Sequence, residues 1–319
     1  MPVLPNSFTF DLAPAPPYDF RLTVKKPAGW ALFTPYEEYG SQTLWTATHV
    51  SGNLLGIKLS SSGSVESPSI KVKVFSVLEL SEREKAHIRS QLTAALGVEQ
   101  DLGEFYRFAS EDSILKHVIH HLYGMHDTSP ISIFPEAVLA ILLQMAPLKR
   151  SNEMMDSFIR EYGEIAEFDR RKIRSWPLPE VMAPVPEGEI AAKCRVGYRA
   201  KSISKLAKKL SEEGFPTMNE LSSMEAVEAR KLLLTLPGIG DYSADIISPH
   251  GGFPIDVWSA EVFGMLFFGK KPENNRQAVE IVKKEGLRRW GKWSWMAFFY
   301  IVQDLKHLSA ELHVDLRIT

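Results

Sequence analysis

The spacing of hydrophobic and polar residues changes near residue 80. Before that point, short runs of β-branched and aromatic residues alternate with polar ones, and clusters of proline, glycine and serine separate the runs. This pattern is typical of strands joined by turns. It predicts strands over SFTFDL (7–12), DFRLTV (19–24), TLWTATHV (43–50), LLGIKLS (54–60) and IKVKVFSVLEL (70–80).

Beyond residue 80 the apolar positions recur at helical spacing. The first predicted helix, 81–97, begins with the capping-box pair Ser81 and Glu84 and ends at Gly97. Further helices are predicted over 111–123, 134–146, 151–166 and 201–212, with a proline-rich loop over 176–189. We therefore expect an α+β protein, with an antiparallel β-rich N-terminal domain over 1–98 and a mostly α-helical body over 99–319.

Composition narrows the class of protein. Of the 319 residues, 45% are hydrophobic and 24% are charged, and the net charge is −2, as in ordinary globular proteins. The sequence has no run of 18 apolar residues and no signal peptide, so we expect no membrane association and an intracellular location. The single cysteine, Cys194, excludes a disulfide, a cysteine-ligated zinc site and a four-cysteine iron–sulfur cluster within one chain.

Positive charge is concentrated in one segment of the last third of the chain. Residues 193–209 contain seven basic residues and no acidic one. Such a stripe fits either a surface that binds a polyanion or the solvated face of a helix. The stripe alone does not decide between them.

The most specific local pattern is LPGIGDYSAD (236–245). The capping-box pair Ser222 and Glu225 predicts a helix before it, and a second helix is expected to start within it. Together these stretches predict a helix-hairpin-helix over about 222–248.

The two glycines of this hairpin, Gly238 and Gly240, allow positive φ and a close backbone approach. The turn leaves backbone amides available where the second helix starts, an arrangement that suits an anion such as a DNA phosphate. A plain αα-hairpin with a glycine turn is the alternative.

Two further features carry possible chemistry. Asp256 precedes the apolar stretch of FPIDVWSAEVFGMLFF (253–268), where it fits a helix N-cap or a catalytic carboxylate at the mouth of a cleft. His120 and His121 are adjacent and point to different sides of a helix, so a metal site there would need partners that the sequence does not identify.

These motifs together resemble the helix-hairpin-helix DNA glycosylases. That family carries an LPGIG-x-(W/Y)-(S/T)-A hairpin followed by P-(I/V)-D-V, matched here by LPGIGDYSA and PIDV. VGYRAKSISKLAKKL (196–210) and PEAVLAILLQ (135–144) resemble the family's segments before the hairpin. The β-rich front resembles the N-terminal domain of alkylpurine and 8-oxoguanine glycosylases. The resemblance covers nearly the whole chain and is strongest over 196–210 and 232–262.

The resemblance implies an enzyme of base-excision DNA repair. Such an enzyme flips a damaged purine out of double-stranded DNA and hydrolyses the N-glycosidic bond, with Asp256 at the place of the catalytic aspartate. Bifunctional members carry a lysine two residues after the second hairpin glycine, where this chain has Tyr242. We therefore expect a monofunctional glycosylase for alkylated purines of the 3-methyladenine type, with little AP-lyase activity. An 8-oxoguanine or other oxidised-purine glycosylase and a non-catalytic hairpin DNA-binding protein are the alternatives.

The resemblance also implies site residues and partners. The implied DNA contacts are Pro237, Gly238, Ile239, Gly240, Tyr242, Ser243, Arg199 and Lys201. The implied substrate pocket contains Tyr242, Gln144 and Trp258, and the backbone carbonyls of Leu234, Leu236 and Ile239 match a Na⁺ or K⁺ site. No cofactor is otherwise required, and we expect a cytoplasmic, nucleoid-associated monomer.

Two of the chain's departures from the family pattern concern the hairpin and Asp256. Asp241 places a negative charge in the turn, where a basic or neutral residue would suit DNA better, so its charge must be avoided or offset. The stretch from Tyr242 to Asp256 is several residues shorter than is typical of the family.

Overall fold

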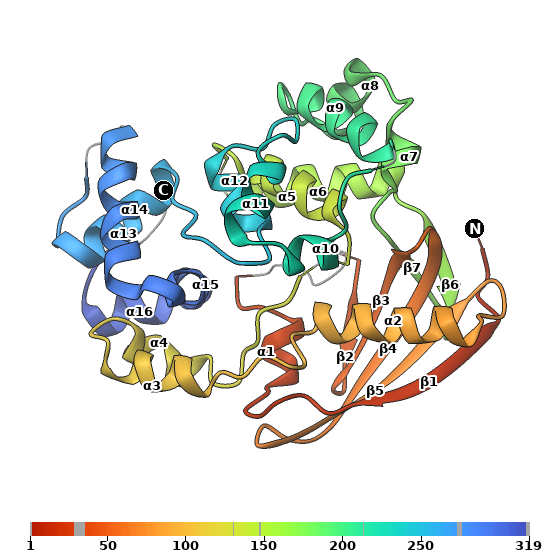
Figure 1. Cartoon of the computed structure of the whole chain (residues 1–319), viewed down its shortest axis with the longest axis horizontal. Coiled ribbons are helices and arrows are strands. Elements are labelled where there is room, and N and C mark those ends of the chain that lie inside the picture. Colours follow the sequence, from red (N-terminus) through yellow and green to blue (C-terminus); the bar gives the residue numbers. More distant parts are fainter. Residues whose placement is uncertain are drawn as a thin grey trace. The chain divides into compact units, whose positions relative to one another are not determined.

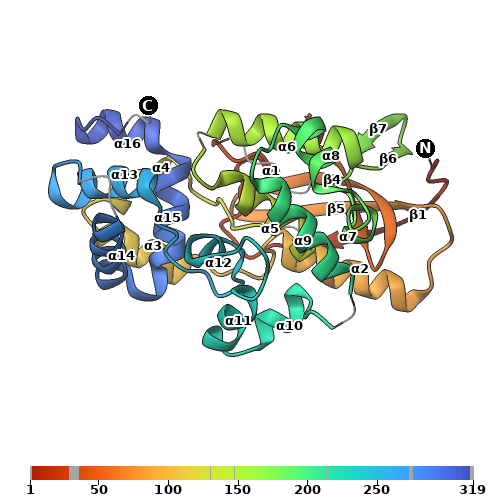
Figure 2. The same ribbon diagram turned by 90° about the horizontal axis from the view of Figure 1, so that it is seen from above.

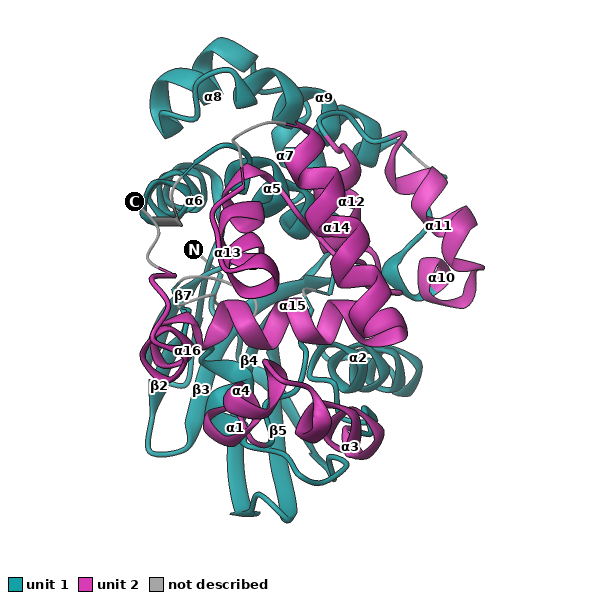
Figure 3. Cartoon of the chain, turned by 90° about the vertical axis from the view of Figure 1, so that its left-hand side faces the viewer, with its two compact units in different colours: residues 1–101, 124–219, 236–238 teal, residues 102–123, 220–235, 239–319 magenta. Residues whose placement is uncertain are grey.

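The structure, a computed structural model, describes residues 2–28, 36–129, 131–146, 148–212, 214–272 and 276–316. Its internal contacts divide the chain into two compact units (Figure 3). Unit 1 comprises Met1–Asp101, Gly124–Asn219 and Leu236–Gly238; unit 2 comprises Leu102–Tyr123, Glu220–Thr235 and Ile239–Thr319. Each unit is made of several separate segments of the chain, whereas the expected domains are two continuous stretches. The domain boundary expected at residue 98 therefore stays a prediction.

Unit 1 is built around a five-stranded antiparallel sheet with strand order β1-β5-β4-β3-β2 (Figure 1). The strands are β1 (Asn6–Leu12), β2 (Glu38–Gly40), β3 (Thr43–Val50), β4 (Asn53–Ser64) and β5 (Ser67–Ser76). In the register of the central strand, Ile57 lies opposite Thr46 on one side and Val74 on the other. The alternating sequence pattern therefore predicted four of the five strands correctly.

Alternate residues of β4 enter two separate cores. Ile57 and Leu59 belong to a core shared with Ile88 and Leu92 of α2 (Glu82–Ala95), which follows the sheet directly in the chain. On the other face, β6 (Ile165–Phe168) and β7 (Arg171–Arg174) form a hairpin that packs against the sheet. Because both faces are covered by apolar side chains, the sheet is a fully packed layer.

The helical part of unit 1 holds the segment that precedes the hairpin turn. Its central helix, α9, packs against α5, α7 and α8 (Figure 1, Figure 2). The helices of unit 1 other than α2 are α1 (Phe20–Val24), α5 (Ile133–Leu143), α6 (Leu148–Tyr162), α7 (Pro179–Met182), α8 (Glu187–Cys194) and α9 (Arg199–Ser211).

Unit 2 is helical. Its core contains an aromatic cluster in which the ring of Phe253 lies 5.1 Å from that of Phe263 and 5.6 Å from that of Trp290. Its helices are α3 (Gly103–Glu111), α4 (Leu115–His121), α11 (Ala226–Leu233), α12 (Asp241–Ile247), α13 (Val257–Phe268), α14 (Arg276–Trp290), η1 (Gly291–Trp293), α15 (Ser294–Gln303) and α16 (Leu305–Leu312). The short helix α10 (Met218–Ser223) spans the change from unit 1 to unit 2. The α+β class is thus confirmed.

Two predicted elements differ in the structure. DFRLTV forms helix α1 instead of a strand, because the carboxylate of Asp19 accepts a hydrogen bond from Leu22 N at 2.8 Å and caps the turn. The capping box predicted from Ser222 and Glu225 is wrong: Ser222 lies in α10, and Glu225 is itself the N-cap residue of α11.

The capping box at Ser81 is confirmed. Its hydroxyl accepts from Glu84 N at 3.3 Å, and the Glu84 carboxylate accepts from Ser81 N at 2.8 Å. Gly97 has φ +60° directly after α2, which is the conformation expected at a helix end. Among the described residues, none of the helices has both the length and the apolar character that a membrane span requires.

Candidate functional site

Gly238, the part of the hairpin turn that belongs to unit 1, packs tightly within that unit. This glycine has φ +81°, and a Cβ built on it would come within 2.6 Å of the Ser202 Cβ and 3.1 Å of the Ile141 Cδ1. Both the left-handed conformation and the lack of space require glycine at this position. The first of the two hairpin glycines is therefore explained by folding.

The second hairpin glycine is different. Gly240 has φ −105° and ψ −170°, an extended conformation open to any residue, so the expectation that it uses positive φ is wrong. It is exposed, and a Cβ built on it would meet no atom within 4 Å. Nothing within the described structure requires Gly240, and the surface beside it is open to a partner.

Gln144 and Arg199 hold Gly238, and all three residues belong to unit 1. Gln144 ends α5, and its Nε2 donates to the carbonyl oxygen of Gly238 at 2.8 Å. Arg199 in turn donates a hydrogen bond from Nη2 to the carbonyl oxygen of Gln144. The Arg199 side chain is buried, which argues against the direct phosphate contact expected for it. Arg199 supports Gln144 at the end of α5, and Gln144 in turn supports the hairpin turn.

The basic stripe is partly neutralised within the chain. Lys193 pairs with Glu189 at 2.8 Å, and Lys209 lies 3.9 Å from Glu212. Lys201 is exposed on α9, and no ion pair of its side chain is found within the described ranges. Of the two basic residues expected at DNA, Lys201 is thus the accessible one.

The negative charge of Asp241 is offset by Arg230 on the preceding helix. Arg230 Nη2 lies 2.8 Å from Asp241 Oδ1 and 3.1 Å from Asp245 Oδ1. Asp245 is buried, and it also pairs with Lys283 of α14. This network ties α12 to α11 and α14, and it offsets the charge of Asp241, which the sequence left as an open requirement.

Asp256 is held by a capping box at the start of α13. Its Oδ1 accepts from Ser259 N at 2.8 Å and from Ser259 Oγ at 2.7 Å, and its own backbone N–H donates to Ser259 Oγ at 2.8 Å. No hydrogen bond to Oδ2 is found among the residues described. One oxygen therefore fixes a half-buried carboxylate while the other stays available for chemistry.

Tyr242 lies near this carboxylate. Burial raises the pKa of the Tyr242 hydroxyl above its usual value, and the negative charge of Asp256 raises it further. Two residues beyond Asp256, the indole Nε1 of Trp258 is buried and has no hydrogen-bond partner in the part of the chain described. A buried donor without a partner is uncommon and is suited to binding an acceptor.

The carbonyls expected to bind a monovalent cation are compatible with that role. Leu234, Leu236 and Ile239 lie between α11 and α12. None of the backbone hydrogen bonds found in this described segment ends on their oxygens. Oxygen atoms of this kind suit Na⁺ or K⁺, since hard cations prefer oxygen ligands.

The structure thus brings the expected residues together in two groups. Gln144, Arg199 and Gly238 meet in unit 1, while Tyr242 and Asp256 lie near each other in unit 2. Sequence reasoning missed Ser259, although the D-x-x-S spacing of a capping box was visible. It also missed Arg230. The only sequence signal for its pairing with Asp241 was that it lies eleven residues earlier in the chain.

Sequence comparison finds two informative relatives. No family profile matches the chain. It is 25% identical over 221 residues to a probable N-glycosylase/DNA lyase of Methanothermobacter thermautotrophicus, covering 62% of this chain and 70% of that protein. It is 24% identical over 210 residues to a DNA-3-methyladenine glycosylase of Bacillus subtilis, covering 64% and 67%.

Comparison of structures covers more of the chain. The 3-methyladenine DNA-glycosylase of Archaeoglobus fulgidus superposes with a TM-score of 0.73 at 19% identity, over 93% of this chain and 99% of that one. The 8-oxoguanine glycosylase/lyase of Clostridium acetobutylicum, in complex with double-stranded DNA, superposes with a TM-score of 0.61 at 15% identity, over 87% and 98%. The chain therefore has the fold of the helix-hairpin-helix DNA glycosylases and resembles that superfamily in sequence over almost two thirds of its length.

Proposed function

We propose that the protein is a monofunctional DNA N-glycosylase of base-excision repair that releases alkylated purines of the 3-methyladenine type. The observation that carries the proposal is the carboxylate of Asp256, held through one oxygen by Ser259 and open at the other. The fold and the sequence likeness to DNA glycosylases support the enzyme class.

The proposed chemistry uses this carboxylate beside the sugar of a flipped nucleotide. Hydrolysis of an N-glycosidic bond passes through an oxocarbenium-like state with positive charge near C1′. A fixed carboxylate stabilises that charge without reorganising, and it orients or deprotonates the attacking water. The base leaves with the electron pair of the broken C–N bond, and water supplies the new C–O bond.

Tyr242 supports hydrolysis in place of a lyase step. The lyase chemistry of bifunctional relatives needs an amine that attacks C1′ and forms a Schiff base. This chain has Tyr242 at that place, and no lysine occurs between Lys231 and Lys270. A phenol whose pKa is raised stays neutral and cannot replace the amine. Its ring suits stacking against a flipped base, and Trp258 is proposed to bind an acceptor there.

DNA is proposed to bind along the hairpin turn. The backbone from Pro237 to Ser243 would contact phosphates, with the open space at Gly240 allowing close approach. Lys201 would add a phosphate contact from α9, and Gln144 would position the turn through Gly238.

A monovalent cation is proposed at the same turn. The carbonyls of Leu234, Leu236 and Ile239 would hold Na⁺ or K⁺, which would add positive charge beside a phosphate. No step of the reaction depends on it, and no other cofactor is proposed.

One observation favours a second candidate, an oxidised-purine glycosylase. The relative from Methanothermobacter thermautotrophicus is named a probable N-glycosylase/DNA lyase, and an 8-oxoguanine glycosylase/lyase shares the fold. The missing lysine argues against lyase activity in this second candidate, but it does not argue against release of an oxidised purine.

The test is base release from duplex oligonucleotides. Substrates would contain 3-methyladenine, hypoxanthine or 8-oxoguanine, and borohydride trapping would report a Schiff base. Release of 3-methyladenine without trapping supports the proposal. Release of 8-oxoguanine alone supports the second candidate, and efficient trapping would overturn the monofunctional assignment. DNA binding without release of any base would favour the non-catalytic alternative.

A further inference from the structure

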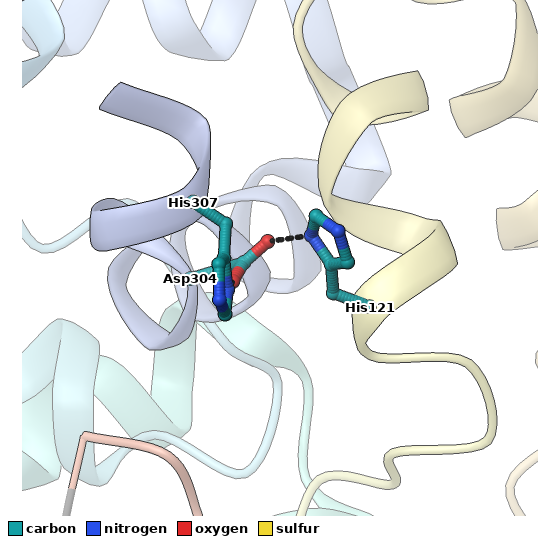
Figure 4. Close-up of side chains that lie close together, drawn as sticks. All are labelled: His121, Asp304 and His307. Atoms are coloured by element: carbon teal, nitrogen blue, oxygen red, sulfur yellow. Dashed lines mark hydrogen bonds and ion pairs between the residues drawn. The ribbon is translucent and has the colours of Figure 1, made fainter. Parts of the chain in front are cut away.

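A cluster of histidine and carboxylate side chains lies in unit 2, on residues that the proposed reaction does not use. His121 ends α4, and His307 lies on α16. Between them is Asp304, the N-cap residue of α16, whose carboxylate accepts no capping hydrogen bond from its own helix. Figure 4 shows the three side chains close together, with the Asp304 carboxylate directed at the His121 imidazole.

The geometry of the three side chains is that of a ligand set. His121 Nδ1 lies 2.9 Å from Asp304 Oδ2, and His307 Nδ1 lies 2.6 Å from Asp304 Oδ1. One nitrogen or oxygen of each residue lies within 4.8 Å of the corresponding atoms of the other two. Tetrahedral Zn²⁺ at 2.0–2.1 Å from its ligands places neighbouring ligand atoms about 3.3 Å apart, so small side-chain rotations suffice.

Two more side chains extend the cluster. Glu311 Oε1 lies 3.6 Å from His121 Nε2, and Glu311 Oε2 lies 2.8 Å from His117 Nδ1. His117 and His121 are four residues apart on α4, and His307 and Glu311 are four apart on α16. Each helix therefore presents two metal-binding side chains on one face.

The burial of the cluster favours a cation. The Asp304 side chain is only 3% exposed, whereas those of His121 and His307 are 38% and 61% exposed. The floor of the site is thus a buried carboxylate, and its rim is open to solvent. A divalent cation bound at this floor would lie against a carboxylate that is shielded from water.

We propose that His121, Asp304 and His307 form a binding site for a divalent transition metal ion such as Zn²⁺. The mixture of imidazole and carboxylate ligands is the type that Zn²⁺ uses in proteins. The ion joins α4 to α16, helices more than 180 residues apart in sequence. Its role is structural: it ties the C-terminal helix to the early part of unit 2, and it takes no part in base release.

The test is Zn²⁺ binding to the full chain after treatment with chelator. Isothermal titration with Zn²⁺ alone should show one ion per chain, and the apparent melting temperature should rise with the Zn²⁺ concentration. His307→Ala should lower the affinity at least about tenfold, since even loss of a group that only supports a ligand costs that much. His121→Ala should do the same, and Co²⁺ should give the visible absorption of a tetrahedral site.

His120→Ala is the matched control. His120 is the exposed neighbour of His121 on the other side of the helix, so its loss should leave both the affinity and the melting response unchanged. Because the His307 side chain is mostly exposed, His307→Ala should fold like the wild type without metal. Absence of stoichiometric binding would overturn the proposal. Binding that His121→Ala and His307→Ala weaken no more than His120→Ala would overturn it as well. Neither result depends on glycosylase activity.

Discussion

The turns that begin α12 and α13 each place an aspartate at the start of a helix, but they use its carboxylate in different ways. Asp241 is the first residue of α12; its side chain is 76% exposed and pairs with Arg230. Asp256 precedes the first residue of α13, and its carboxylate folds back onto Ser259. A shift of one position along the helix start separates a carboxylate on the surface from one that caps the helix.

The difference determines which charge each turn can attract. Gly240 precedes α12 and has no side chain to cap it, so the amides of that turn remain available to an anion. The corresponding place at α13 is already occupied by the carboxylate of Asp256, which repels an anion and attracts a developing positive charge. The proposed reaction needs both kinds of site: one for phosphate and one for the sugar cation.

The largest effect should come from Asp256→Asn. The amide still caps α13, since asparagine is as good an N-cap residue as aspartate, but it no longer carries a negative charge. We expect base release to fall about 100- to 1,000-fold, with an unchanged melting temperature. Single-turnover base release and thermal unfolding measure the two quantities.

The other aspartate is the control for this variant. Asp241→Asn should leave the rate of base release within about threefold of the wild-type rate, because its carboxylate lies on the surface and its loss makes the turn no more negative. Equal losses for Asp241→Asn and Asp256→Asn would contradict the separate roles of the two carboxylates.

The next effect should separate the two glycines of the hairpin. Gly238→Ala should lower the free energy of unfolding by about 2–4 kcal/mol, because φ is positive and Ser202 occupies the space of a Cβ. Gly240→Ala should change it by less than about 1 kcal/mol but weaken DNA binding. Urea denaturation and fluorescence anisotropy with a labelled duplex measure both. Equal stability of the two variants would show that the turn is not fixed as described.

A smaller effect is expected for Ser259→Ala. The variant loses the hydroxyl bonds to Asp256 Oδ1 and to the Asp256 backbone, but the bond from Ser259 N remains. The carboxylate should become less ordered, and kcat should fall about tenfold at constant KM. A change in KM alone would contradict a role for Ser259 in positioning Asp256.

The smallest effect concerns Tyr242. Burial is the main cause of its raised pKa and Asp256 the second, so Asp256→Asn should lower that pKa part of the way toward the usual value of 10.0. Because the folded-state pKa lies above the unfolded one, the associated stability is lost as pH rises above about 10. The Asp256→Asn variant should therefore lose less folding stability than the wild type above about pH 10. Carbon-13 NMR of labelled tyrosine, assigned with Tyr242→Phe, follows the titration.

Much of the fold could be predicted from local patterns. The alternation of β3 to β5 and the caps at Ser81 and Asp256 depend on residues close together in sequence, and they were predicted correctly. DFRLTV was predicted wrongly because its β-branched and aromatic residues favour a strand, whereas the hydrogen bond that the Asp19 carboxylate accepts from Leu22 N favours a helix.

The parts that could not be predicted depend on contacts distant in sequence. The need for glycine at 238 comes from Ser202 and Ile141, which only the folded chain brings near. Asp304 and His307 lie 183 and 186 residues further along the chain than His121, so the sequence around His121 gave no indication of them. Periodicity and caps report the local structure of the chain, but they do not report what the fold places beside it.

The doubly held oxygen of Asp256 has a consequence for entropy. A free aspartate samples several rotamers, and confining such a side chain during a reaction costs about 0.5–1.5 kcal/mol. Here Ser259 confines it when the protein folds, before any DNA is present. The orientation of the second oxygen is therefore set by the torsions of one helix turn. A glutamate at this position has one more side-chain torsion, so it could not both cap α13 and hold its second oxygen in the same place.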